Sequence, residues 1–141
     1  MRRHSKKLYR SGLEYDTACD LRTKKNISYE YEPSDKKIVY IVPESTHKYT
    51  PDFVITTATG KTIIVETKGV FDSEDRKKHL LIRQQHPELD IRFVFTRSKA
   101  RIRKRSKTTY ADICEGRGRA PFKGITWKYS DKTIPEEWLN E

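Results

Sequence analysis

Two carboxylates and a lysine adjoin hydrophobic runs, which normally avoid charged neighbours. Asp52 directly precedes Phe53-Val54-Ile55, and Glu66 and Lys68 follow Ile63-Ile64-Val65. Runs rich in β-branched and aromatic residues are typical of β-strands. Side chains two residues apart lie on the same face of a strand, so we expect Glu66 and Lys68 to point the same way.

The two runs are near enough in the chain to pair as one hairpin. Pro51 is compatible with the start of a strand over 52–57. Gly60 supplies a turn before a second strand over 61–67. The pairing predicts that Asp52 and Glu66 lie on neighbouring strands, so that two carboxylates and an ammonium meet at one edge of the sheet.

Paired carboxylates suit a hard, oxygen-seeking cation such as Mg²⁺ or Mn²⁺. Such ions stabilise charge on a phosphoryl group and lower the pKa of bound water, and two of them about 3.5–4 Å apart clamp the attacking and leaving oxygens. Lys68 could position or deprotonate the attacking water, or offset phosphate charge. The arrangement indicates phosphodiester hydrolysis. Taken alone, a Pro-Asp turn and a Glu-x-Lys strand pair are also ordinary surface features.

Positive charge is segregated along the chain. Of 30 Lys and Arg residues against 20 Asp and Glu, the stretch 76–107 holds twelve basic and two acidic residues, and residues 1–10 hold five basic residues and no acid. Segregation of this kind is typical of proteins that bind polyanions, although charge runs are often merely solvated. The residues expected to contact DNA are Arg2, Arg3, Lys6, Lys7 and Arg10 in the arm, and Arg76, Lys77, Lys78, Arg97, Lys99, Arg101, Arg103, Lys104, Arg105 and Lys107 in the central stretch.

The chain of 141 residues predicts one α/β domain over 11–141 behind a basic arm at 1–10. Helices are expected at 11–25, 72–86, 109–115 and 134–139, and strands at 28–32, 37–42, 52–57, 61–67 and 90–96, with a loop at 116–124. Two scattered cysteines and four histidines give no zinc spacing. Lacking a transmembrane run or a signal peptide, the protein is expected to be soluble and intracellular.

Glu14 is a third candidate carboxylate. It lies three residues after Ser11, a plausible N-cap, so the residue types favour a capping box in which Glu14 bonds back to the start of its helix. A helix in register with the sheet could instead present Glu14 to the metal site.

Several strings of residues, in order along the chain, resemble the endonuclease I family of the T-odd phages, Holliday-junction resolvases of the PD-(D/E)xK nuclease superfamily. The strings are Arg10-Ser11-Gly12-Leu13-Glu14, Tyr49-Thr50-Pro51-Asp52-Phe53, Val65-Glu66-Thr67-Lys68-Gly69, the stretch 75–83 and the stretch 85–92. The resemblance implies a restriction-endonuclease-like mixed central sheet flanked by helices.

The resemblance also implies roles for individual residues. Asp52, Glu66 and the Thr67 carbonyl would ligate Mg²⁺ or Mn²⁺, with two ions in each site, Lys68 would assist the water, and Glu14 would join the catalytic residues, against the capping interpretation. It implies an intertwined homodimer in which residues 11–45 are exchanged across a bridge near 38–45, so that Glu14 of one subunit serves the site of the other.

The leading hypothesis is therefore a metal-dependent endodeoxyribonuclease that resolves four-way junctions and other branched DNA by paired incisions, in the cytoplasm of a phage-infected bacterium. A general or sequence-specific nuclease of the same superfamily is the enzymatic alternative. A non-catalytic nucleic-acid-binding protein is the alternative from another class, and it leaves Asp52, Glu66 and Lys68 without a role.

Overall fold

The computed structural model describes residues 9–42 and 45–141. In chain order the elements are α1 (Gly12–Arg22), β1 (Ser28–Tyr31), β2 (Ile38–Val42), β3 (Ser45–Tyr49), β4 (Phe53–Thr56), β5 (Thr62–Lys68), α2 (Ser73–Gln85), β6 (Ile91–Phe95), α3 (Tyr110–Cys114), β7 (Tyr129–Asp131) and α4 (Glu136–Leu139). All four expected helices and all five expected strands are present, with ends that differ by a few residues.

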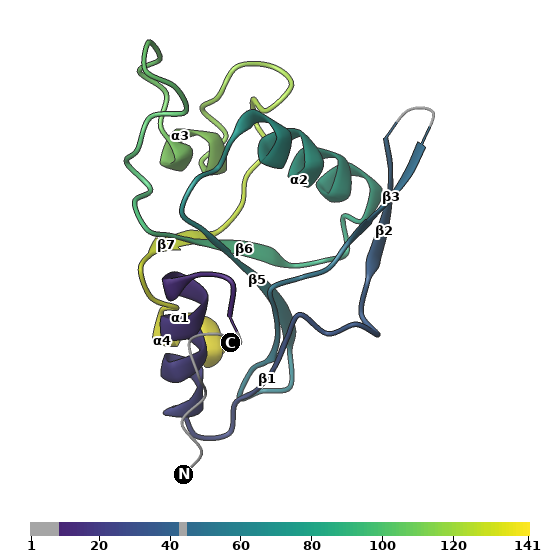
Figure 1. Cartoon of the computed structure of the whole chain (residues 1–141), viewed down its shortest axis with the longest axis vertical. Coiled ribbons are helices and arrows are strands. Elements are labelled where there is room, and N and C mark those ends of the chain that lie inside the picture. Colours follow the sequence, from purple (N-terminus) through teal and green to yellow (C-terminus); the bar gives the residue numbers. More distant parts are fainter. Residues whose placement is uncertain (1–8, 43–44) are drawn as a thin grey trace.

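A mixed sheet of five strands forms the centre of the fold, in the order β1-β4-β5-β6-β7. The strands β1, β4 and β5 are antiparallel neighbours, whereas β5, β6 and β7 run parallel. Helices flank this sheet, so the predicted mixed α/β fold class is confirmed (Figure 1).

The expected hairpin is formed by β4 and β5. Phe53 is the register partner of Val65, and Thr56 is the partner of Thr62. Gly60 closes the turn with a φ of +89°, a left-handed conformation that glycine adopts without steric cost. The register sets Asp52 opposite Glu66, because each lies one residue beyond the Phe53–Val65 pair.

Side chains alternate between two packed faces of the sheet. On one face, Phe53, Ile55, Ile63 and Val65 pack with α1 and α4, through Ala18, Leu21, Trp138 and Leu139. On the other face, Ile64 packs with Ile82 of α2. Figure 1 shows α1 and α4 together on one side of the sheet and α2 on the other. Glu66 and Lys68 share the face of Ile64, since they lie two and four residues after it.

Two strands were not expected from the sequence. The strand β3 pairs with β2 in a separate antiparallel hairpin, which projects from one side of the molecule in Figure 1. The three-residue strand β7 extends the main sheet. The segment expected to bridge two subunits, 38–45, therefore forms β2 and the first residue of β3 in this single chain, with residues 43–44 outside the described residues. None of the helices that the structure describes is long and apolar enough to cross a membrane.

A buried arginine fixes the start of β6 to the C-terminal segment. Arg92 is fully buried and donates two hydrogen bonds to Asp90, both 2.8 Å long. It also pairs with Glu141 and lies over the Trp138 ring, 5.3 Å from its centroid. The hydrogen bonds from Arg92 lower the pKa values of Asp90 and Glu141 to about 2.

We expect this network to make stability depend on pH in acid. A carboxylate whose pKa is lowered by folding stabilises the protein above its unfolded pKa, near 3.8 for Asp90, and that contribution is lost as the pH falls towards 2. The thermal midpoint should therefore fall steeply between pH 4 and pH 2. At pH 6, Asp90→Asn should lower the free energy of unfolding by about 2 kcal/mol, and the thermal midpoint with it. Below pH 4 the midpoint of the variant should depend less on pH than that of the wild type. If the thermal midpoints of the two proteins changed with pH in parallel, Asp90 would not be a source of the pH dependence.

Candidate active site

Asp52 and Glu66 meet where β4 begins and β5 ends. Both are buried, with 5% and 3% of their surface exposed. Glu66 Oε1 accepts a hydrogen bond from the Asp52 backbone N–H at 2.9 Å and another from the Tyr49 hydroxyl. Asp52 Oδ2 accepts hydrogen bonds from Thr67 N (3.0 Å) and Thr67 Oγ1 (3.1 Å). Two backbone N–H groups and two hydroxyl groups therefore hold the carboxylates in place.

Glu14 reaches the same place from α1. Ser11 is the N-cap, and its hydroxyl accepts a hydrogen bond from Glu14 N at 3.1 Å. The Glu14 carboxylate, however, accepts its hydrogen bonds from Arg10 N, at 2.9 Å, and from the Tyr31 hydroxyl. The capping-box interpretation of this side chain is wrong, because its carboxylate accepts from Arg10 N and Tyr31 rather than from Ser11 N–H.

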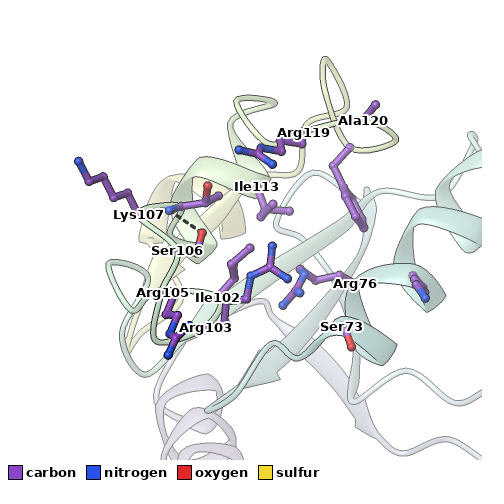
Figure 2. Close-up of a pocket in the computed structure, with 13 residues that line it drawn as sticks. Ser73, Arg76, Ile102, Arg103, Arg105, Ser106, Lys107, Ile113, Arg119 and Ala120 are labelled. Carbon is purple, nitrogen blue, oxygen red and sulfur yellow. Dashed lines mark hydrogen bonds between the residues drawn. The ribbon is translucent and has the colours of Figure 1, made fainter.

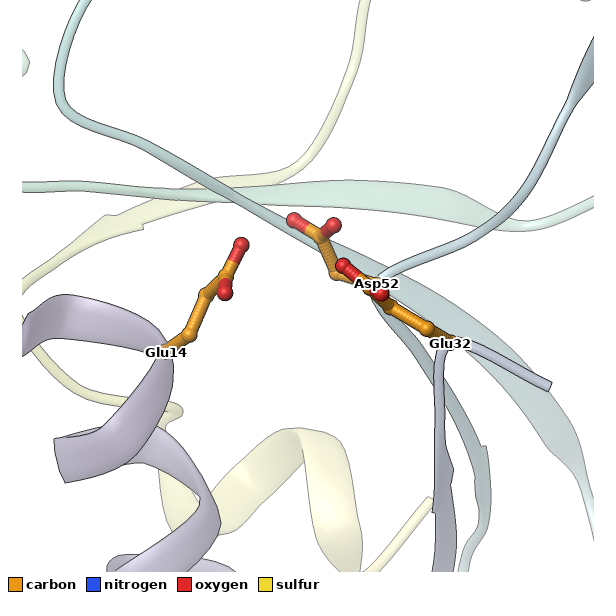
Figure 3. A group of neighbouring side chains, drawn as sticks. All are labelled: Glu14, Glu32 and Asp52. Atoms are coloured by element: carbon orange, nitrogen blue, oxygen red, sulfur yellow. The ribbon is translucent and has the colours of Figure 1, made fainter. Parts of the chain in front are cut away.

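Glu32, which follows β1, completes a cluster with Glu14 and Asp52. One carboxylate oxygen from each of these residues lies within 4.8 Å of the others, and Figure 3 shows Glu14 extending from α1 towards Asp52 and Glu32. Glu32 is placed by its backbone N–H, which donates to the Asp52 carbonyl at 3.0 Å. Arg10 lies against the cluster, with Nε 2.7 Å from Glu32 and a second nitrogen 3.9 Å from Asp52.

Burial disfavours the negative charge of Asp52 and Glu66. Burial raises the pKa of Glu66 to about 8, and the nearby Asp52 adds to the rise, while Lys68 opposes it. Burial also raises the pKa of Asp52, with a further contribution from Glu14, against hydrogen bonds from Thr67. A divalent cation among these oxygens would remove the repulsion, and carboxylate oxygens are the donors that such cations prefer. The residues present therefore fit a divalent metal ion.

Lys68 is held on the α2 side of the sheet. Its ammonium lies 3.1 Å from Asp75 Oδ1, and both side chains are largely shielded from solvent. Asp75 is itself fixed in the first turn of α2, where its backbone N–H donates to the N-cap Asp72 at 2.9 Å. Lys68 is near enough to the carboxylates to favour the ionised forms of Asp52 and Glu66.

The residues expected to contact DNA differ in how exposed they are. Those of the 97–107 stretch are all exposed, on a loop that follows β6 directly, and Arg10 and Lys77 are exposed as well. Lys78 is half-buried over the Tyr49 ring. Arg76 differs from the expectation of a surface cation, because it is buried and donates to the Phe71 carbonyl at 2.7 Å. Arg2, Arg3, Lys6 and Lys7 lie outside the described residues.

Three residues of the site were not singled out from the sequence: Glu32, Tyr49 and Asp75. A signal existed for Glu32, since pairing of the 28–32 strand with the 52–57 strand would have set it beside Asp52. Tyr49 and Asp75 belong to the quoted strings, but only their contacts with Glu66 and Lys68 show what they do.

Comparison with known proteins places the chain in a family. The model of the phage endonuclease I family matches residues 1–141. The chain is 47% identical to endonuclease I of Escherichia phage T7 over 133 residues, which are 94% of this chain and 79% of that protein. It is 45% identical to endodeoxyribonuclease 1 of Enterobacteria phage T3 over 133 residues, 94% of this chain and 78% of that one. The chain therefore belongs to the phage endonuclease I family, and it is an endonuclease, as its sequence predicted.

Proposed function

We propose that this protein is a metal-dependent, structure-selective DNA endonuclease that resolves four-way junctions in the infected bacterial cell. The observation that carries the proposal is the convergence of Glu14, Asp52 and Glu66, from α1, β4 and β5, beside the ammonium of Lys68. DNA as the substrate is supported by the names of the phage T7 and T3 relatives and by the net charge of +10.

In the proposed chemistry, Asp52, Glu66 and the Thr67 carbonyl would hold Mg²⁺ or Mn²⁺, and Glu14 would contribute to a second ion. The bound ions supply Lewis acidity towards the phosphate and a lowered pKa of water. Lys68 remains paired with Asp75, and its ammonium orients the attacking water and offsets the charge of the phosphate. Thr67 and Tyr49 keep the two carboxylates in place through their hydrogen bonds.

The exposed cations of the 97–107 loop are proposed to bind the phosphate backbone. They extend from the end of β6, the strand that neighbours β5, so DNA held there lies near the carboxylates. Contacts of this kind position the substrate without reading its sequence, which suits an enzyme that selects by shape.

We further propose that two chains form a dimer by exchanging residues 11–45. In the single chain, Glu14 lies beside its own Asp52. If the β2–β3 hairpin opens, residues 11–45 can make with a second chain the same contacts that they make with their own chain. The exchange therefore costs little contact energy. The exposed apolar side chains of β2 support this, since Val39 is 46% and Ile41 57% exposed. Two sites in one dimer can then cut two strands within one binding event.

The proposal is tested with a synthetic four-way junction and a linear duplex of the same arm sequence. With Mg²⁺ the protein should cut the junction in two opposed strands and leave the duplex largely intact, and a chelator should stop cleavage. Equal cutting of junction and duplex would favour a general nuclease of this family. If the protein bound the junction but did not cleave it at any Mg²⁺ or Mn²⁺ concentration, it would be a non-catalytic DNA-binding protein, and the proposal would be wrong.

Metal binding should also be visible in stability, without any DNA. Mg²⁺ at 100-fold its dissociation constant should stabilise the protein by about 2.7 kcal/mol. Asp52→Asn keeps an oxygen for the two Thr67 bonds but removes one of the clustered charges, so its thermal midpoint without metal should equal or exceed that of the wild type. Its midpoint should not respond to Mg²⁺. The control is Asp16→Asn, an exposed carboxylate of α1, which should respond like the wild type. If Mg²⁺ raised the thermal midpoint of both variants equally, Asp52 would not be a metal ligand.

A further inference from the structure

A hollow of about 710 Å³ lies between three segments that are far apart in the sequence. Its lining comes from the first turns of α2, from the 102–108 loop, and from α3 with the loop that follows it (Figure 2). The lining carries six cations and no carboxylate. The cations are Arg76, Lys77, Arg103, Arg105, Lys107 and Arg119.

Arg76 is the most informative of these residues. It is 8% exposed, and one of its nitrogens donates to the Phe71 carbonyl at 2.7 Å. Within the residues that the structure describes, it forms no ion pair with a carboxylate. Burial lowers the pKa of its guanidinium and Arg103 adds to this, while Tyr110, Asp72 and Asp75 oppose the change. A cation that has lost water without gaining a counter-ion carries a cost in free energy.

Arg92 shows how the same chain treats a buried arginine that serves structure alone. It is fully buried and pairs with both Asp90 and Glu141, which contribute to raising its pKa. Arg76 has no ion pair of this kind in the described residues, because Asp72 and Asp75 act on it only at longer range and Arg103 opposes them. The contrast indicates that the counter-ion of Arg76 is supplied by a ligand.

Three features of the hollow define that ligand. The rim cations Arg103 and Arg119 are exposed, and no ion pair is recorded for either in the described parts of the chain, so both can take an anion. Ile102, Ile113 and Phe122 provide apolar wall, which a small inorganic anion alone would leave uncovered. Ser73 adds a hydroxyl donor at the start of α2. An anionic group joined to a less polar body satisfies all three, and a phosphodiester between two sugars is such a group.

We propose that this hollow binds one backbone phosphate of the DNA that is not itself one of the cleaved phosphodiesters. The inference rests on the proposed DNA substrate. Arg76 directly follows Asp75, which contacts Lys68, so the first turn of α2 connects the hollow with the lysine of the candidate active site. A strand that leaves the cutting site along this turn reaches the hollow. The pocket thereby fixes the register of the strand relative to Asp52 and Glu66.

The test removes single charges from the DNA rather than only from the protein. Methylphosphonate linkages, which are neutral, are placed one at a time along each strand near the cutting site, and affinity is measured without metal. For the wild type, one linkage should weaken binding about tenfold, the loss expected for a charged hydrogen bond. In the double variant Arg103→Gln/Arg119→Gln the penalty at that linkage should be clearly smaller, because two of the cations that face the phosphate are gone while Arg76 remains.

The matched control is Lys123→Gln/Lys132→Gln, which removes two exposed charges that do not line the hollow. It should keep the tenfold penalty at the same linkage. Arg103 and Arg119 are chosen over Arg76 because exposed positions do not put folding at risk. If the double variant retains every penalty of the wild type, the pocket does not bind phosphate, even where the unmodified junction is cut normally. Failure of the wild type to bind any DNA would overturn both the pocket and the proposed function.

Discussion

Replacing Asp52 by Asn or Glu66 by Gln should abolish cleavage while leaving junction binding close to that of the wild type. Both changes are isosteric, so the hydrogen bonds from Thr67, Tyr49 and the Asp52 N–H keep an acceptor. What is lost is the negative charge that holds metal. Loss of a residue that only supports a metal ligand costs about 10–100-fold in activity, so loss of a ligand itself should cost at least about 100-fold.

Binding should survive because affinity for DNA comes from contacts between cations and phosphates. Removing a carboxylate even reduces repulsion from the backbone. Gel-shift and cleavage assays on one synthetic junction measure the two properties separately, with Asp16→Asn as the control. A variant that cuts at nearly the wild-type rate would show that the carboxylate is not part of the reaction. A variant that neither binds nor cuts would indicate a structural role.

A mixed dimer of Glu14→Ala and Glu66→Ala subunits should regain activity that both parent homodimers lack. In an exchanged dimer, Glu14 of one chain serves the site that holds Glu66 of the partner subunit. Both lesions then fall into one site, and the other site is wholly wild type. The mixed dimer should therefore nick one strand of a junction and fail at paired incision.

An unexchanged dimer gives the opposite result, because each site then carries one lesion. Co-expression of differently tagged chains supplies the mixed dimer, since exchanged subunits separate only by extensive unfolding. Nicking activity is measured on the purified mixed dimer, with the two homodimers purified in the same way as controls. A mixed dimer as inactive as its parents would contradict the exchange, and Glu14 would then act within its own chain, as in the arrangement seen here.

The helices and the central strands could be predicted because their signals are local. The run Ile63-Ile64-Val65 and the Gly60 turn determine a hairpin, and the hairpin determines that Asp52 lies opposite Glu66. The strand β3 carries no such signal. Its sequence, Ser-Thr-His-Lys-Tyr, is polar, and four of its five residues are exposed, so pairing with β2 rather than burial forms it.

The rest of the site depends on contacts between distant segments. The local sequence around Glu14 favours a capping box, and only the packing of α1 against β1 and β5 brings its carboxylate to Asp52. Glu32 enters through the register of β1, which sequence patterns specify poorly. The charge run around Arg76 gives no sign that this residue is buried. Its burial depends on α2 packing against the loops that surround the hollow.

The most direct test of the account uses a supercoiled plasmid that extrudes a cruciform, incubated with the wild-type protein and Mg²⁺. Paired incision across the junction converts supercoiled circles to linear molecules cut at the cruciform, with nicked circles only a minor product. We predict that outcome, together with no reaction in chelator and no linear product from a plasmid without the cruciform. Nicked circles alone, or linear products cut at random positions in both plasmids, would contradict a junction-resolving enzyme with two coordinated sites.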